Sequence, residues 1–493
     1  MEKLNLVPYP EQITMTGGYL SASAKLTERE TDVLKKEAYF LRITENEIYM
    51  EGDKAGLFFA HVTLKQLKLQ FGDRIPCMEI KDAPRYAHRG FMLDSSRHFL
   101  PKKEVLRIID VLALFKINRL HWHLIDDQGF RVEISAYPKL TEIGAVRGRS
   151  HFGLVDEYKN NCGYFTKEDI REVIAYAGER MIEIIPEIEI PGHESAMLAA
   201  YPEVGCGKVP VEVVTTGGIF DNLICAGKES SFEFVTKILD ELMELFPYEM
   251  IHIGGDEACK RKWRACPDCQ RKKRELGLTD ENALQQWFVI RIQKYLKEKG
   301  KTSIVWNDSL RGGTLPADAV VQMWMGDKDL ITEFVNRGGK FIQSSTECHY
   351  LDYPYFIWDT HALLDSEPCP DYLAGKDALL GIECPLWMER VVDLERFFYQ
   401  MLPRIPAMAE CAWTAEAARD NESFDERYVG IEAFLNGKGI YGAPREYWKI
   451  NEETAAQERK EYERILYTPE NLAEFEKQGK MMEEERAIYG DER

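Results

Sequence analysis

The N-terminal part of the chain alternates short apolar runs with turns. Residues 41–44 and 48–50 have the length of strands, and residues 56–67 repeat apolar side chains at the helical period. Such a mixture is typical of a small α+β domain. The segment Asp82-Ala83-Pro84 ends this pattern, because proline has no backbone N–H to donate to a strand neighbour. We therefore predict an α+β domain over residues 1–84.

From residue 85 onward, apolar strand patterns alternate with helical ones. Pro101 opens one helical stretch, whose apolar residues keep the 3.6-residue period as far as Phe115, and Thr166 has the chemistry of a helix cap. Helices are also expected over residues 281–297 and 329–336. Eight strands are expected, at residues 90–94, 119–123, 181–187, 250–254, 303–306, 319–323, 340–343 and 380–383. This alternation predicts an α/β protein with a (β/α)₈ TIM barrel as catalytic domain, over residues 85–445.

After residue 445 the chain becomes charged and helical. The pattern predicts helices over 452–465 and 471–488. We expect a C-terminal helical extension, residues 446–493, packed on the outside of the barrel.

Composition narrows the range of partners. The 493 residues carry a net charge of −20, and 45% of them are apolar, as in a globular protein. Nucleic acid and anionic membranes select basic surfaces, so neither is expected as the main partner. No stretch approaches the roughly 20 apolar residues of a membrane helix, and the N-terminus lacks the apolar core of a signal peptide.

The cysteine pattern favours reduced thiols. There are 11 cysteines, an odd number, and several lie in expected core strands. This usage predicts a cytoplasmic protein. Cys266-Pro-Asp-Cys269 is a lone C-x-x-C with no second pair nearby in the sequence, which favours a loop carrying two thiols over a zinc or redox site.

Reactive side chains follow the ends of the expected strands. In such a barrel the active site lies where the C-terminal strand ends meet. The residues at these ends are Asp94, Arg97, His98, Asp126, Asp127, Gln128, Glu187, Glu189, His193, Asp256, Glu257, Trp306, Trp324, Tyr350, Asp352, Trp387 and Glu389. Each alone has a structural explanation, since tryptophans are mostly core residues and carboxylates often cap helices. Together they predict a carbohydrate pocket, in which aromatic faces stack on sugar rings and charged groups hold hydroxyls.

The run His252-Ile-Gly-Gly-Asp256-Glu257 carries the most specific chemistry. An apolar strand is broken by two glycines, and two adjacent carboxylates follow. Neighbouring acids repel each other and resist desolvation, so one is expected to gain a raised pKa while the other stays ionised. Sugar hydrolysis needs both states: a proton donor and a charge facing a cationic transition state.

Two other functions remain open from the residues alone. His121 and His123 lie on one face of a strand, as a metal-binding H-x-H would, and with Asp126, Asp127 and His252 they allow a metal-dependent barrel hydrolase. Against it, the pair precedes the carboxylates and is expected to point into the barrel interior. A non-catalytic sugar-binding protein is the other alternative, but it has no need of the Asp256-Glu257 pair.

The chain resembles the family 20 glycoside hydrolases, the β-N-acetylhexosaminidases, over roughly residues 1–445. The resemblance rests on the motifs Asp94-Ser-Ser-Arg97-His-Phe, His121-Trp-His-Leu-Ile-Asp126-Asp-Gln-Gly, Pro-Glu-Ile-Glu189-Ile-Pro-Gly-His193, His-Ile-Gly-Gly-Asp256-Glu257, Trp306, Gln-Met-Trp324, Tyr350-Leu-Asp352 and Pro-Leu-Trp387-Met-Glu389. It implies hydrolysis, with retention, of terminal β-linked N-acetylglucosamine or N-acetylgalactosamine from an oligosaccharide or glycoconjugate. It also implies that no cofactor is needed, and that the substrate's own acetamido group is the nucleophile.

The resemblance also implies a role for each residue. Glu257 would be the general acid/base, Asp256 would hold the acetamido N–H and stabilise the oxazolinium ion, and Tyr350 would donate to the acetamido oxygen. The other expected substrate-binding residues are Trp306, Trp324 and Trp387 around the acetamido group, Arg97, Asp352 and Glu389 at the hydroxyls, and Asp126 and His193 behind Glu257. The chain departs from the family at Glu189, where an aspartate is usual, and after Asp352, where the place of Trp358 as a stacking residue is open.

Overall fold

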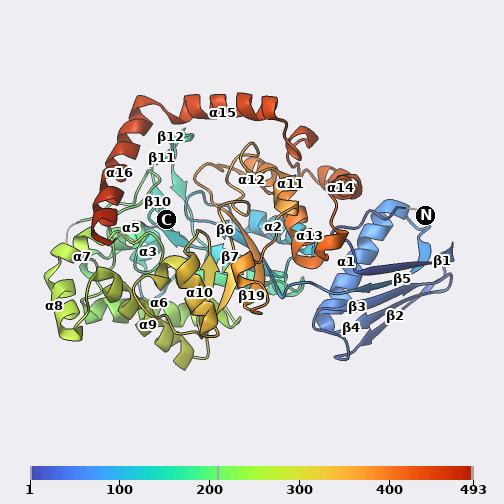
Figure 1. Cartoon of the computed structure of the whole chain (residues 1–493), viewed down its shortest axis with the longest axis horizontal. Helices are drawn as coiled ribbons and strands as arrows, with labels where there is room; N and C mark the ends of the chain where they lie inside the picture. The colour runs from blue at the N-terminus through green and yellow to red at the C-terminus, as the bar shows by residue number, and fades with distance from the viewer. Residues whose placement is uncertain (1–2, 208–209, 490–493) are drawn as a thin grey trace.

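The computed structural model describes residues 3–207 and 210–489 (Figure 1). The first two residues of the expected N-terminal domain and the last four of the C-terminal extension lie outside this range. Among the helices of the described part, none combines the length and the apolarity that crossing a bilayer requires.

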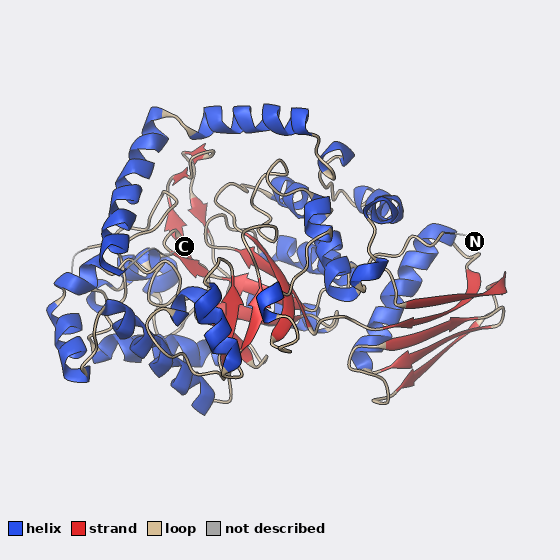
Figure 2. Cartoon of the chain, in the orientation of Figure 1, coloured by secondary structure: helices blue, strands red, loops and turns tan. Residues whose placement is uncertain are grey.

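A closed barrel of eight parallel strands forms the centre of the molecule, as the sequence predicts (Figure 2). Each expected strand is present, although the fourth ends early, at His252, and the eighth runs on to Leu386. The strands, in barrel order, are β14 Glu183–Glu187, β15 Met250–His252, β16 Thr302–Trp306, β17 Val320–Met323, β18 Lys340–Gln343, β19 Leu379–Leu386, β6 His88–Asp94 and β7 Arg119–His123.

Helices surround this barrel and bury their apolar faces against it. Local chemistry fixes their starts: Pro101 precedes α2, and Thr166 and Asp169 form a capping box at α4. The larger helices of this layer are α2 Lys102–Leu114, α4 Lys167–Gly178, α6 Glu229–Leu245, α9 Glu281–Glu298, α10 Lys328–Asn336, α12 Leu394–Met401 and α13 Arg404–Trp413.

The N-terminal residues form a five-stranded sheet backed by one helix, α1 Lys54–Phe71. The sheet has the order β1-β5-β3-β4-β2, from β1 Gln12–Tyr19, β2 Lys25–Glu30, β3 Tyr39–Ile43, β4 Glu47–Gly52 and β5 Pro76–Asp82. Asp82 joins it to the barrel, because its carboxylate accepts from Lys116 Nζ at 2.9 Å and from Trp413 Nε1 at 2.7 Å. These buried polar contacts fix the sheet on the side of the barrel away from α16 (Figure 1).

The C-terminal helices do more than cover the outside of the barrel. After α14 Asn421–Asn436, the helices α15 Glu452–Leu466 and α16 Pro469–Tyr489 arch around the barrel (Figure 1). Asn471 Nδ2 donates to Gly153 O at 3.0 Å, and Gln478 Nε2 donates to Gly217 O at 2.8 Å. Those two glycines lie in loops at the pocket described below, so the expectation of an exterior packing is only partly right. The sequence did not predict this contact, because these helices are charged and bury few residues.

Candidate active site

A pocket of about 370 Å³ opens at the C-terminal ends of the strands. Ten of the eleven residues predicted for the site line it: Arg97, Asp126, His193, Asp256, Glu257, Trp324, Tyr350, Asp352, Trp387 and Glu389. The arrangement follows from the topology, since all eight parallel strands end at the same rim.

Trp306 is the predicted residue that does not reach the pocket lining. Its side chain is 1% exposed, and its Nε1 donates to Glu187 Oε1 at 2.9 Å. The ring lies beneath Trp387, with 6.2 Å between ring centroids. Trp306 therefore packs behind the pocket wall and does not form its surface.

The glycines before the carboxylate pair allow a tight turn that aims Asp256 and Glu257 into the pocket. Gly254 and Gly255 have φ values of +64° and +107°. A Cβ at Gly254 would lie 1.8 Å from Glu189 Oε2, and one at Gly255 would lie 2.3 Å from Ser309 Oγ. Glu257 itself has φ +45°, a strained backbone conformation of the kind concentrated at functional sites.

The two carboxyl groups differ in their exposure. The side chain of Asp256 is 12% exposed and that of Glu257 is 32% exposed. Burial raises the pKa of Asp256 to about 7, with repulsion from Glu257 adding to the effect and His193 opposing it. A raised pKa in the pair was expected, but not on Asp256, which should stay ionised. The physical reason is that Asp256 is the more buried acid, with other carboxylates around it.

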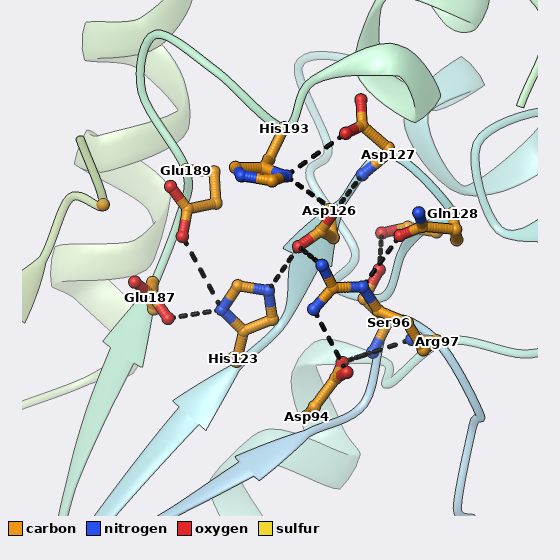
Figure 3. A network of polar contacts seen from close by, with 12 residues as sticks. Asp94, Ser96, Arg97, His123, Asp126, Asp127, Gln128, Glu187, Glu189 and His193 are labelled. Carbon is orange, nitrogen blue, oxygen red and sulfur yellow. Dashed lines mark hydrogen bonds and ion pairs between the residues drawn. The ribbon is translucent and has the colours of Figure 1, made fainter. Parts of the chain in front are cut away.

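His193 belongs to a buried polar network (Figure 3), and it lies beside the carboxylate pair. Its Nε2 lies 3.6 Å from Glu257 Oε2, and its Nδ1 lies 3.3 Å from Asp126 Oδ1 and 3.2 Å from Asp127 Oδ2. Burial lowers the pKa of His193, but Asp126, Asp127 and Glu257 together outweigh it and raise that pKa well above its usual range. Asp127 was expected at this strand end, but the resemblance assigned it no role, and the structure gives it one in holding His193.

Glu189 does not hold His193 as the usual aspartate of the motif would. Burial and the nearby Asp256 raise the pKa of Glu189 well above its usual range, which favours the neutral acid. A neutral carboxyl cannot pair with an imidazolium by charge. His193 is held instead by Asp126 and Asp127.

Arg97 is locked in place on the opposite side of the network (Figure 3). Its guanidinium lies 2.6 Å from Asp126 Oδ2 and 3.2 Å from Asp94 Oδ2, and its Nε donates to Gln128 at 2.8 Å. The same guanidinium lies 5.0 Å from the ring centroid of Trp387. Such a group presents a fixed set of donors to a sugar hydroxyl.

The aromatic wall consists of Trp324, Tyr350 and Trp387. Trp324 and Tyr350 are stacked, with centroids 6.3 Å apart and planes 23° apart, and Trp387 lies 6.3 Å from Tyr350. Trp324 Nε1 donates to Asp308 Oδ2 at 2.8 Å, which fixes the ring. Trp324 and Trp387 are both half-buried, and Trp324, with its polar edge already satisfied, leaves its apolar face for a ligand.

The histidines of the H-x-H motif point into the barrel interior. His121 Nδ1 lies 2.7 Å from Glu383 Oε1, and His123 Nδ1 contacts Glu187. Burial lowers the pKa of both rings, but the carboxylates around them, Glu187 first among these, together outweigh it and raise the pKa to about 9 for His121 and about 10 for His123. Neither histidine lines the pocket, and both are already paired with buried carboxylates. This placement argues against the metal-dependent hydrolase.

One side of the pocket comes from segments that the sequence did not mark. They are the loops around β11 Ser150–His151 and around Thr216, together with one face of α16. The lining residues there are His151, Phe152, Gly153, Thr216, Gly217, Gly218, Asn471, Glu474, Phe475 and Gln478. No motif or periodicity identifies them, because they meet only through long-range folding.

Comparison with known proteins agrees with this geometry. The family model described as "Glycosyl hydrolase family 20, catalytic domain" matches residues 86–416. The model described as "Glycosyl hydrolase family 20, domain 2" matches residues 10–83. A β-hexosaminidase of Porphyromonas gingivalis is 38% identical over 83% of this chain, which spans 54% of that relative's length. A β-hexosaminidase of Akkermansia muciniphila is 32% identical, with 90% of this chain and 92% of the relative covered.

Solved structures show the same likeness. The crystal structure of a β-N-acetylhexosaminidase superposes with a TM-score of 0.84 at 30% identity, covering 90% of this chain and 98% of the other. An exo-β-N-acetylglucosaminidase of Vibrio harveyi in complex with N-acetylglucosamine gives a TM-score of 0.80 at 28% identity, with 91% and 80% covered. The fold, the order of the motifs and the residues of the pocket all point to one family. The chain belongs to glycosyl hydrolase family 20, the family of retaining exo-β-N-acetylhexosaminidases.

Proposed function

We propose that this enzyme removes single terminal β-linked N-acetylglucosamine or N-acetylgalactosamine residues from oligosaccharides or glycoconjugates. One observation carries the proposal: Asp256 and Glu257 face a small pocket walled by Trp324, Tyr350 and Trp387. Aromatic faces of this kind accept the apolar methyl and ring surfaces of an N-acetyl sugar.

Glu257 is the proton donor in this proposal. It is the more exposed acid of the pair and lies on the open side of the pocket, where a glycosidic oxygen would arrive. The imidazolium of His193 lies 3.6 Å from it, in reach of the carboxylate that remains once the proton has moved to the leaving group. Glu257 then accepts a proton from the attacking water in the second step.

Asp256 and Tyr350 position the internal nucleophile. The acetamido oxygen attacks the anomeric carbon while the bond to the leaving group breaks, which forms a bicyclic oxazolinium ion. Tyr350 donates to the acetamido oxygen, and Asp256 accepts from the acetamido N–H. A developing positive charge beside Asp256 favours its ionised form, so substrate binding lowers the pKa that burial raises in the free enzyme.

Arg97, Asp352 and Glu389 bind the ring hydroxyls. Arg97 Nη2 lies 3.8 Å from Glu389 Oε1, so the two mark one edge of the sugar site. Burial, assisted by Glu389, raises the pKa of Asp352 to about 7. A partly protonated carboxyl can both donate to and accept from a hydroxyl.

The leaving group lies between α16 and the loop that carries β11. Phe152, Phe475 and Gln478 line this side of the pocket. We infer that these residues contact the second sugar or the aglycone.

A paired substrate assay tests the activity. Aryl N-acetyl-β-glucosaminide and N-acetyl-β-galactosaminide should be cleaved, whereas an aryl lacto-N-bioside should release no disaccharide. The matching aryl glucoside, which lacks the 2-acetamido group, should be almost inert. Release of the intact disaccharide would contradict the exo-acting monosaccharide pocket.

The internal nucleophile has its own test. A thiazoline mimic of the bicyclic intermediate should inhibit the wild type strongly and Asp256→Asn far less, because the variant loses the charge that holds the cation. Trapping a covalent sugar ester on any carboxylate of the protein would overturn the mechanism.

We also propose a cytoplasmic location, supported by the eleven unpaired cysteines. Fractionation of the source cells tests it, and recovery of the enzyme outside the cytoplasm would contradict it.

A further inference from the structure

Four cysteine thiols converge beside the active-site rim. Cys206 and Cys225 belong to the segment between α5 Ser195–Ala200 and α6, and Cys266 and Cys269 follow the Asp256-Glu257 turn. Their Sγ atoms all lie within 4.8 Å of one another. Cys225, Cys266 and Cys269 are buried, and Cys206 is half-buried.

The sulfur spacing matches the edges of a metal-centred tetrahedron. Cys225 Sγ lies 3.5 Å from Cys269 Sγ and 3.7 Å from Cys266 Sγ, and Cys206 Sγ lies 3.7 Å from Cys269 Sγ. With Zn–S bonds of about 2.3 Å, the sulfurs of a tetrahedral site are about 3.8 Å apart. Bonded sulfurs would be about 2.05 Å apart, so the cluster has the shape of four ligands around one ion.

The backbone around Cys266 and Cys269 has the form of a metal-binding knuckle. Cys266 is the N-cap residue of α8 Pro267–Leu276, and Cys269 lies in the first turn of that helix. The two residues have the C-x₂-C spacing of structural zinc sites. The positive end of the helix dipole also favours the thiolate form that a metal requires.

The second pair is held against this knuckle by close backbone packing. Gly227, two residues after Cys225, lies so near that a Cβ there would be 2.2 Å from the carbonyl carbon of Asp268 and 2.4 Å from Cys269 N. On the other side, Lys228 Nζ donates to Gly205 O at 2.6 Å, directly before Cys206. Two segments more than 40 residues apart are thus built to bring their thiols together.

We propose that Cys206, Cys225, Cys266 and Cys269 bind one structural Zn²⁺ ion. Four thiolates complete a tetrahedral shell and leave no open position, which is the arrangement of structural rather than catalytic zinc. Binding releases the protons of the thiols that are still protonated, and no redox change is involved. The sequence showed only the Cys266/Cys269 pair, because the other two ligands lie far from it along the chain.

The ion would clamp together the two segments that carry His193 and Glu257. Ile224 N donates to Pro191 O at 3.2 Å, which links the cysteine segment to the His193 turn. Trp263 Nε1 donates to Ile224 O at 2.9 Å, which links it to the segment after Glu257. The site therefore stabilises the packing of two segments beside the active site, without touching the substrate or the acid/base residue.

Metal analysis of the full chain, purified without added metal and under reducing conditions, tests the proposal. Elemental mass spectrometry should find one zinc ion per chain. Cys225→Ser and Cys269→Ser should each lose most of it, while Cys162→Ser, at an exposed cysteine outside the cluster, should keep it. Glu257→Gln should also keep it, which separates the cluster from the group of His193, Asp256 and Glu257 in the active site.

A second measurement uses only the wild-type chain, in case the variants fail to fold. Exchange with Co²⁺ should produce the visible absorption of tetrahedral cobalt with four thiolates. Brief treatment with a strong chelator should lower Tm while leaving hydrolysis by the surviving folded enzyme intact, so a failure here is distinct from a failure of the proposed sugar chemistry.

Four results would overturn the zinc assignment. They are zinc retained in the Cys225→Ser and Cys269→Ser variants, iron in place of zinc, disulfides among the four cysteines in the purified chain, and a metal-free chain with four reactive thiols that takes up no cobalt.

Discussion

The two sides of the pocket are built in different ways. The barrel side comes from the ends of seven of the eight strands, and Arg97 and Asp126 on this side are buried and paired with each other. The α16 side comes from the last helix of the described chain, of which only Asn471 and Glu485 are buried. Rigid, dry surroundings strengthen electrostatic effects, whereas exposed contacts contribute little. We therefore expect the residues of the barrel side to perform the reaction, and those of the α16 side to select the leaving group.

Removing the proton donor should produce the largest effect. Glu257→Gln should slow hydrolysis of natural oligosaccharides by ~10²–10⁴-fold, the usual contribution of general acid catalysis, and activated aryl leaving groups should suffer less in the first step. Steady-state rates on both substrate classes measure this. Near wild-type turnover of oligosaccharides would remove Glu257 from its role.

Opening the aromatic wall should have the next largest effect. Trp324→Ala should weaken binding of N-acetyl sugars by up to about 3 kcal/mol, since a face that stacks on the ligand is lost. The control is Trp287→Ala, a half-buried tryptophan on α9 that is absent from the pocket lining. Unfolding of the Trp324 variant alone would show that this ring belongs to the core.

The buried acid should reveal itself through pH. The folded-state pKa of Asp256, about 7, is above the ordinary aspartate value of 3.8, so the folded protein loses stability as pH rises through this interval and keeps it below about pH 4. Asp256→Asn removes the penalty and should raise stability at pH 8 by about 1–3 kcal/mol, with little change near pH 4. Tm measured at both pH values tests this.

The control for the pH experiment is Asp377→Asn, whose side chain is fully exposed and should change Tm at neither pH. If Asp256→Asn raised Tm equally at both pH values, burial would not be raising the pKa of this carboxyl.

The α16 side should give the smallest effect. Phe475→Ala should raise KM for oligosaccharides by about 2–10-fold, as expected for one aromatic contact, with kcat for small aryl glycosides unchanged. Leu472→Ala is the matched control, because Leu472 is exposed on the same helix and does not line the pocket. A large loss on aryl glycosides in Phe475→Ala would place α16 in the catalytic machinery and remove the distinction between the two sides.

The parts that the sequence predicted are those set by local pattern and barrel topology. Buried strands appear in the sequence as apolar runs, and the residues that follow them include the pocket residues from Arg97 to Glu389. The edge strand β2 was missed because all six of its residues are exposed and so carry no alternation. Trp306 could not be placed either, since motif position does not distinguish a pocket wall from the layer beneath it. Similarly, the pKa of Asp256 depends on how deeply the folded chain buries it.

The α16 helix has a consequence for how relatives of this enzyme can diversify. The residues that perform the reaction are distributed over many strands, so a change in one disturbs several neighbours. The residues of α16 that line the pocket lie on one terminal element, attached to the rest by a few contacts such as Gln478 to Gly217. Single substitutions on this helix can therefore adapt the enzyme to new leaving groups, while the residues that catalyse the reaction stay unchanged.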